Sequence, residues 1–209
     1  MSAPTERELK LSLPDPDELP RLLAALPAAT AVLTQDNLYF VEPGAPPERA
    51  RIMVRLRQER RDGADGRWLL TVKSGSQAVD GYFVAEEREA ELDEATAARI
   101  AADPSALLGV GVEPARWLTE EAGVGALVPL GGMRNRRHLV PCAGFLLEVD
   151  RTEFPGGVVE AEVEVETERA DEARALLLEV AERAGVRLVA QTLGKFTRFR
   201  VHLAAATSV

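Results

Sequence analysis

The feature of this sequence that most constrains its fold is a series of short segments in which charged and apolar residues alternate. In the segment 160–166 every second residue is a glutamate, and the residues between are alanine or valine. Side chains two positions apart point to the same face of a β-strand, so each segment predicts a strand with one charged and one apolar face. The predicted faces carry mainly one sign of charge: acidic at Glu6 and Glu8, at Glu87, Glu89 and Glu91, at Glu148 and Asp150, and along 160–166; basic at Arg55 and Arg57, at Lys73, and within 134–138.

One such face is most often the solvated side of a sheet. For the whole set this interpretation is weaker, because a surface selected for solubility intersperses the signs of charge and because like charges on neighbouring strands repel. Both difficulties disappear if the charged faces point inward around a closed barrel. Clustered carboxylates there would bind a hard divalent cation, Mg²⁺ or Mn²⁺, and the Lys and Arg side chains would bind phosphate oxygens. The pattern therefore predicts a lumen that holds a polyphosphate between metal and guanidinium.

Composition limits the other classes of function. The net charge of −9 argues against binding to a nucleic acid duplex, which needs a basic surface, but it permits a local phosphate pocket. No apolar run approaches the roughly twenty residues that cross a bilayer, and the N-terminus lacks the sections of a signal peptide. The single Cys142 has no cysteine partner. We expect one cytoplasmic domain over residues 1–209, without a membrane partner, as a monomer or homodimer.

The order of predicted elements indicates an α+β chain built on one large sheet or barrel. Helices are predicted at 19–26, within 93–123 and at 171–184, where apolar residues recur at helical spacing before Gly185. A tight loop is predicted at Gly131 and Gly132. Strands are predicted at 5–13, 30–40, 50–58, 67–75, 85–92, 126–130, 133–140, 144–152, 158–167, 186–191 and 196–203.

The run from Glu6 to Lys10 has the form Glu-x-Glu-x-Lys and resembles the opening motif of the CYTH, or triphosphate tunnel metalloenzyme, family. Further motifs follow in family order: Arg55-Leu-Arg57, Thr71-Val-Lys73, Glu89-Ala-Glu91, Arg137, Leu147-Glu-Val-Asp150, Glu162-Val-Glu164 and Gly194-Lys195-Phe196. The segment 147–154 resembles the plant tripolyphosphatase members. Over residues 6 to about 203, the resemblance implies an eight-stranded antiparallel β-barrel, the triphosphate tunnel, with a few flanking helices.

The same resemblance implies roles for individual residues. The implied ligands for Mg²⁺ or Mn²⁺ are Glu6, Glu8, Asp150, Glu162 and Glu164. The implied phosphate-binding residues are Lys10, Arg55, Arg57, Lys73, Arg137 and Lys195, with Arg134 and Arg136 as alternatives to Arg137. The implied catalytic residues are Lys10, Glu89 and Glu91, the two glutamates as further ligands or as groups that position water.

One motif departs from the family. Its second strand usually contains two aromatic residues followed by Asp-Thr, whereas this chain has Tyr39-Phe40-Val41-Glu42. Glu42 could replace the aspartate only if the strand ends in a bulge, because a slip of one residue reverses the direction of a side chain. The departure leaves the predicted architecture intact and bears only on catalytic competence.

Members of the family hydrolyse inorganic triphosphate, thiamine triphosphate or RNA 5′-triphosphates, and some form cyclic AMP from ATP. For this chain we expect metal-dependent hydrolysis of inorganic tripolyphosphate to pyrophosphate and phosphate, by in-line attack of water. The alternatives are a thiamine triphosphatase, which would need an aromatic or apolar platform near the mouth, and a class IV-like adenylate cyclase. Another class is a non-catalytic module that binds polyphosphate or nucleotides, and the blandest alternative is a structural barrel.

Overall fold

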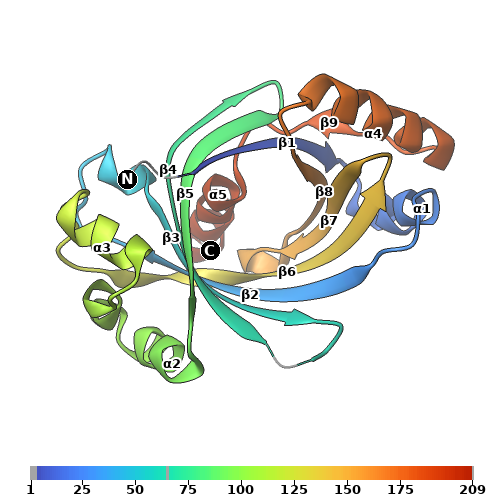
Figure 1. Ribbon diagram of the computed structural model, residues 1–209. Helices are drawn as coiled ribbons and strands as arrows, with labels where there is room; N and C mark the ends of the chain where they lie inside the picture. Colours follow the sequence, from blue (N-terminus) through green and yellow to red (C-terminus); the bar gives the residue numbers. More distant parts are fainter. Residues whose placement is uncertain (1–3, 65, 209) are drawn as a thin grey trace.

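The computed structural model of the chain describes residues 4–64 and 66–208. Eight antiparallel strands form a ring in the order β5-β4-β3-β2-β6-β7-β8-β1, and pairing of β5 with β1 closes it (Figure 1). A short β9 pairs with β1. The strands are β1 (Thr5–Leu13), β2 (Ala31–Val41), β3 (Met53–Arg61), β4 (Arg67–Val79), β5 (Tyr82–Leu92), β6 (Val128–Cys142), β7 (Phe145–Glu153), β8 (Val159–Glu166) and β9 (Val189–Ala190). The predicted α+β fold with an eight-stranded antiparallel barrel is confirmed.

The strands turn their charged faces into the barrel and their apolar faces outward. On β8, Val163 and Val165 belong to an outer apolar cluster, whereas Glu162 and Glu164 are buried and form ion pairs with residues of other walls. Alternation along a strand sends successive side chains to opposite faces, so the apolar outer face needs a covering layer, which the helices provide here.

Helices cover two flanks of the barrel (Figure 1). On one flank, α1 (Leu19–Ala24) and α4 (Ala170–Ala184) pack against the outer faces of β1, β7 and β8. On the other, α2 (Glu94–Ala102), the 3-10 helix η3 (Pro104–Gly109) and α3 (Glu113–Glu120) cover the outer faces of β3 and β4. These helices confirm the predictions at 171–184 and within 93–123, and α1 ends two residues before the predicted 19–26. None of the helices described here is long and apolar enough to cross a membrane.

The predicted loop at Gly131 and Gly132 is wrong, because both glycines lie inside the continuous strand β6. Gly131 has a φ of 135°, and the register between β6 and β2 shifts at this point. A Cβ on Gly132 would lie 2.5 Å from the backbone oxygen of Asn37. The β-bulge is at Leu130, next to Gly131, and at Gly132 β6 approaches β2 too closely for a larger residue.

The C-terminal segment is also corrected. The predicted strand at 196–203 is the helix α5 (Lys195–Thr207), and of the predicted strand at 186–191 only Val189–Ala190 pairs as β9. Pairing of β5 with β1 has already closed the ring, so no barrel edge is free for a further full strand. Phe196 and Phe199 instead lie one helical turn apart and pack against Tyr39, and α5 covers that end of the barrel.

Phe199 anchors this helix, and its side chain has no exposed surface. Its ring centroid lies 4.8 Å from that of Tyr39. We expect Phe199→Ala to lower the free energy of unfolding by about 3–5 kcal/mol, because it leaves a cavity and removes an aromatic pair. Urea unfolding measures the loss, and an unchanged midpoint would contradict the assigned packing of α5.

Candidate functional site

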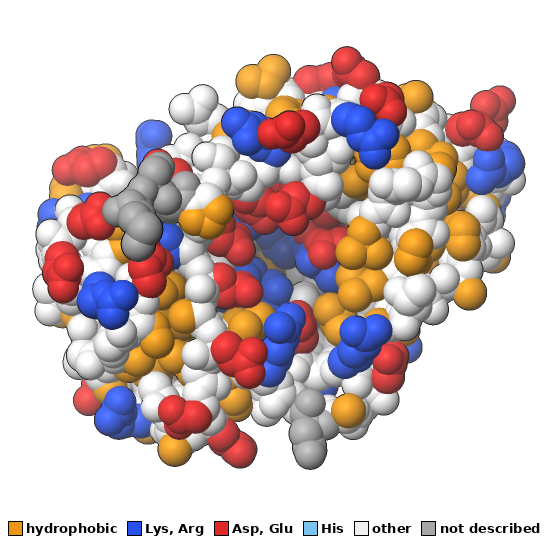
Figure 2. All heavy atoms as spheres, in the orientation of Figure 1, with side chains coloured by type: hydrophobic (Ala, Val, Ile, Leu, Met, Phe, Trp, Pro, Cys, Tyr) orange, Lys and Arg blue, Asp and Glu red, His pale blue; other side chains and the backbone are white. Residues whose placement is uncertain are grey.

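The barrel encloses a deep charged lumen that opens at the end opposite α5. Figure 2 shows Asp, Glu, Lys and Arg side chains gathered around and inside this central hollow. The carboxylates outnumber the cations. Inward-facing carboxylates are Glu6, Glu8, Glu59, Glu87, Glu89, Glu91, Glu148, Asp150, Glu160, Glu162, Glu164 and Glu166; the cations among them are Lys10, Arg55, Arg57, Lys73, Arg137, Lys195 and Arg198.

Three carboxylates form the deepest acidic cluster. Asp150 lies directly opposite Glu162 across β7 and β8, and Glu164 follows on the same face of β8. Each of the three offers an oxygen within 4.8 Å of the others, and all three side chains are buried. Glu162 Oε1 is buried, and the ammonium of Lys195 lies 2.9 Å from it. A cluster of carboxylate oxygens without nitrogen or sulfur ligands fits a hard divalent cation such as Mg²⁺ or Mn²⁺.

Cations from three other elements surround this acidic cluster. Lys195 Nζ, at the start of α5, lies 2.5 Å from Asp150 and 2.9 Å from Glu162. Arg137 donates to Asp150 at 2.8 and 2.6 Å and to Glu164 at 2.5 Å. Burial alone would raise the pKa of Asp150, but Arg137 and Lys195 hold that pKa below its ordinary value. The Asp150 carboxylate is therefore available as an anionic ligand.

The five predicted metal ligands fall into two groups. Asp150, Glu162 and Glu164 lie together, whereas Glu6 and Glu8 lie on β1 nearer the mouth. Lys10 connects the two groups. Lys10 Nζ lies 2.7 Å from Glu164 and 2.9 Å from Glu8, and Lys73 is paired with Glu6 and, at 2.7 Å, with Glu87. Although burial lowers the pKa of Lys10, Glu164 and Glu8 raise it further, so the ammonium remains charged.

Arg55 and Arg57 form the wall opposite the acidic cluster, because β3 lies four strands from β8 in either direction around the ring. Among residues 4–64 and 66–208, the carboxylates nearest to these two guanidiniums are those of Glu89 and Glu59, each at 4.0 Å. Burial, followed by the charges of Arg55 and Arg137, lowers the pKa of Arg57 to about 9. A buried cation that lacks an anion is a ready binding site for phosphate oxygens.

The remaining predicted residues lie in three places. Glu89 and Glu91 are exposed at the β5 side of the mouth, where Glu89 accepts a hydrogen bond of 2.9 Å from Thr71. Arg137 faces the lumen, while the alternative Arg134 is exposed and pairs with Asp36. Arg136 is likewise exposed.

Glu42 does not enter the site. It lies beyond the end of β2 and accepts hydrogen bonds from Arg49 in the following loop, at 2.7 and 3.3 Å. The bulge of β6 opposite Tyr39 and Phe40 does not bring Glu42 into the lumen. The glutamate therefore fixes a loop and does not replace the family aspartate among the lumen residues.

Sequence reasoning missed Arg198 and a row of neutral polar side chains. Arg198 donates to Glu162 at 2.5 Å and also to Glu160. The polar row crosses β7, β6, β2 and β3 as one chain of buried hydrogen bonds, from Thr152 to Asn135, from Asn135 to Gln35, and from Gln35 to Glu59. Alternation within 35–39 could have revealed the polar row. The direction of Arg198 was missed because residues 196–203 were predicted as a strand, whereas Arg198 lies on the helix α5 and reaches Glu162 from there.

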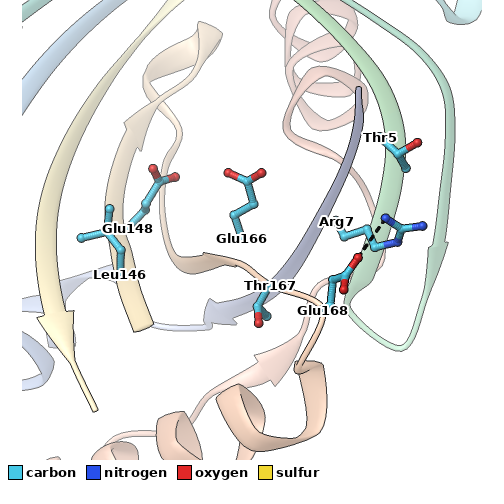
Figure 3. Close-up of a pocket in the computed structure, with 7 residues that line it drawn as sticks. All are labelled: Thr5, Arg7, Leu146, Glu148, Glu166, Thr167 and Glu168. Carbon is cyan, nitrogen blue, oxygen red and sulfur yellow. Dashed lines mark hydrogen bonds and ion pairs between the residues drawn. The ribbon is translucent and has the colours of Figure 1, made fainter. Parts of the chain in front are cut away.

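A pocket of about 400 Å³ lies beside the mouth, beyond the end of β8. In Figure 3, Glu148 and Glu166 extend in the same direction from neighbouring strands, and Arg7 meets Glu168 on the other side. Burial raises the pKa of Glu148, and burial together with Glu6 and Glu8 raises that of Glu166. The mouth is therefore acidic beyond what its own cations neutralise.

The chain is thus a closed antiparallel barrel with an acidic inner wall opposite a basic one. The family model of the CYTH domain matches residues 4–192, and the chain belongs to this family.

Solved structures share the fold. A protein from Hippeastrum, described as an adenylyl cyclase candidate with a dominant triphosphatase activity, is 29% identical, has a TM-score of 0.83, and the match covers 94% of this chain and 95% of that one. An adenylate cyclase candidate from Bacillus halodurans is 19% identical, with a TM-score of 0.65 and coverage of 93% and 98%. The PH1819 protein of Pyrococcus horikoshii is 15% identical, with a TM-score of 0.57 and coverage of 96% and 99%. No curated protein sequence matches the chain significantly.

The acidic cluster leads to a prediction about metal binding. We expect Mn²⁺ or Mg²⁺ to raise the midpoint of thermal unfolding, because an ion that binds only the folded state stabilises it. Asp150→Asn should weaken the apparent affinity for the metal at least tenfold, since it removes one ligand and a partner of Arg137. An equal thermal shift in Asp150→Asn and the unmodified chain would contradict the site.

Proposed function

We propose that this chain is a metal-dependent triphosphatase whose preferred substrate is inorganic tripolyphosphate. The observation that carries the proposal is the opposition of two buried walls across one lumen. The acidic cluster of Asp150, Glu162 and Glu164 lies on β7 and β8. The guanidiniums of Arg55 and Arg57, whose nearest carboxylates are 4.0 Å away, lie on β3. A linear polyanion complexed with a divalent cation satisfies both walls at once.

In this proposal the carboxylates, the two β3 arginines and the other cations have separate roles in phosphoryl transfer. Asp150, Glu162 and Glu164 would hold a divalent cation, which would supply charge neutralisation to the phosphate oxygens. Arg55 and Arg57 bind and orient the phosphate chain, because a guanidinium matches two phosphate oxygens. Neighbouring carboxylates raise the pKa of Lys10, Arg137 and Lys195 against the effect of burial, so these three side chains stay protonated and stabilise the charge on the leaving oxygens.

The mouth is the place where the attacking water is oriented in this proposal. Glu89 and Glu91 are exposed there, and Glu89 is held by Thr71. Glu6 and Glu8 extend the carboxylate surface from the deep cluster toward the mouth and serve as further ligands. Phosphoryl transfer depends mainly on position and electrostatic stabilisation, and this distribution of charges provides both.

The types of residue that line the mouth pocket favour an inorganic substrate. Among the described residues that line the mouth pocket none is aromatic, and its apolar member is Leu146. Tyr39, Phe196 and Phe199 pack at the closed end, and Phe83 lies beneath Lys10 inside the lumen. A thiamine or adenine ring would therefore find no stacking partner in this pocket. The dominant triphosphatase activity described for the similar Hippeastrum protein supports the same substrate class.

The test compares phosphate release from inorganic triphosphate, thiamine triphosphate and ATP at equal concentrations with Mg²⁺ or Mn²⁺, with cyclic AMP measured in the ATP reaction. We expect inorganic triphosphate to give the highest kcat/KM by at least tenfold. Faster release from thiamine triphosphate, or formation of cyclic AMP, would replace the substrate assignment. Triphosphate binding without turnover would identify a binding module.

A further inference from the structure

Arg57 is held by a neutral side chain. Its Nε donates a hydrogen bond of 2.8 Å to the amide oxygen Oδ1 of Asn37 on the neighbouring strand β2. Both side chains are almost fully buried, with 8% of Arg57 and 5% of Asn37 exposed. The nearest carboxylate, that of Glu59, lies 4.0 Å from Nη1 of Arg57. The bond to Asn37 therefore fixes the guanidinium without neutralising its charge.

The orientation of the Asn37 amide is itself determined. Its Nδ2 donates to the backbone oxygens of Gln35, at 3.1 Å, and Met133, at 3.3 Å. These oxygens can only accept, so a flipped amide would lose both bonds. Oδ1 must therefore face Arg57, and the two bonds tie the acceptor to β2 and β6 together.

The other arginine of this strand shows the same arrangement. Arg55 donates to the hydroxyl of Thr71 on β4 at 3.0 Å, and its Nε is buried without a partner. In contrast, Lys10, Lys73, Arg137 and Lys195 each have a carboxylate oxygen within 2.7 Å. Neutral partners are thus confined to the two guanidiniums on β3.

Resting on the proposed function, we propose that Asn37 is a positioning residue for substrate: its neutral amide orients Arg57 and leaves the guanidinium charge for a phosphate group of the triphosphate. A carboxylate at this position would form an internal ion pair and compete with phosphate. Asn37 thereby determines that β3 binds an anionic ligand, whereas the walls opposite it bind cations.

The test uses Asn37→Asp, which keeps the shape of the side chain and adds one negative charge. Affinity for inorganic triphosphate is measured by calorimetry with chelator present, and kcat and KM are measured with Mg²⁺. We expect affinity to fall by about tenfold or more, and KM to rise by more than kcat falls, because an internal ion pair occupies the phosphate-binding guanidinium. Thr34→Asp is the matched control, since it adds the same charge to the outer face of β2. Its affinity should equal that of the unmodified chain.

A double-mutant cycle separates positioning from a merely structural role. If Asn37 acts through Arg57, Asn37→Asp should change the affinity of an Arg57→Met variant by less than about twofold. An equal loss in both backgrounds would overturn the proposal. Asn37→Thr, whose hydroxyl is too short to replace the amide, provides an uncharged second variant if Asn37→Asp is unstable, and unchanged KM in Asn37→Thr would also overturn it. Absence of triphosphate binding and turnover in the unmodified chain would instead refute the proposed function itself.

Discussion

Replacing Glu164 with Gln is expected to reduce phosphate release from inorganic triphosphate at least 100-fold and to destabilise the metal-free protein by about 3 kcal/mol. Glu164 is a candidate metal ligand and also pairs with Lys10, Arg137 and Lys195. Burial opposes its ionisation, but these cations hold the pKa of Glu164 well below its ordinary value. Loss of its charge would leave buried cations without compensation.

Glu166→Gln is the matched control, because the residue lies two positions further along the same face of β8. Burial and the charges of Glu6 and Glu8 raise its pKa, which means that the fold disfavours the ionised form. Stability associated with the neutral form is greatest at low pH and is lost as the pH rises through the raised pKa, so Glu166→Gln should not destabilise the protein at neutral pH. Thermal unfolding of both variants tests this, and equal losses in the two would contradict the assigned charge distribution.

Arg57→Met should separate activity from stability. We expect kcat/KM for inorganic triphosphate to fall about 100- to 1,000-fold, corresponding to about 2.7–4 kcal/mol of lost transition-state stabilisation. We also expect the unfolding free energy to stay equal or to rise, because burial without an anion disfavours the guanidinium and lowers its pKa. Lower kcat/KM together with equal or higher stability is expected when a charged group serves activity at a cost in stability.

Arg60→Met provides the comparison on the same strand. Arg60 faces outward and pairs with Asp36, so its removal should leave kcat/KM unchanged. Steady-state kinetics and urea unfolding of both variants are the measurements. A large stability loss in Arg57→Met with unchanged kinetics would show that Arg57 is structural.

The period of two along the strands predicted charged faces that could point into a closed barrel, and the family resemblance supplied the eight-stranded architecture. The period places Glu162 and Glu164 on one face whatever the neighbouring strands are, and β8 has that arrangement. The direction of Arg137 needed the family resemblance, because the bulge at Leu130 changes the register of β6 against β2. Local pattern alone does not contain such a shift.

The C-terminal helix α5 could not be predicted from the sequence pattern alone. The alternation of apolar and polar residues from Phe196 onward is typical of a strand, but the closed ring offers no free edge, and packing of Phe199 against Tyr39 favours a helix. Tertiary context thus overrides local preference. For the same reason the approach of Arg198 to Glu162 and the role of Asn37 could be seen only in three dimensions.

The most direct measurement is the initial rate of phosphate release from inorganic triphosphate as Mg²⁺ or Mn²⁺ is raised from zero, with chelator, to saturation. The opposed walls predict a rate near background without metal, a saturable rise with metal, and a rise that is nearly abolished in Glu164→Gln and Arg57→Met. A rate that is independent of metal, or turnover that survives both substitutions, would contradict a site built from the acidic cluster and the β3 guanidiniums.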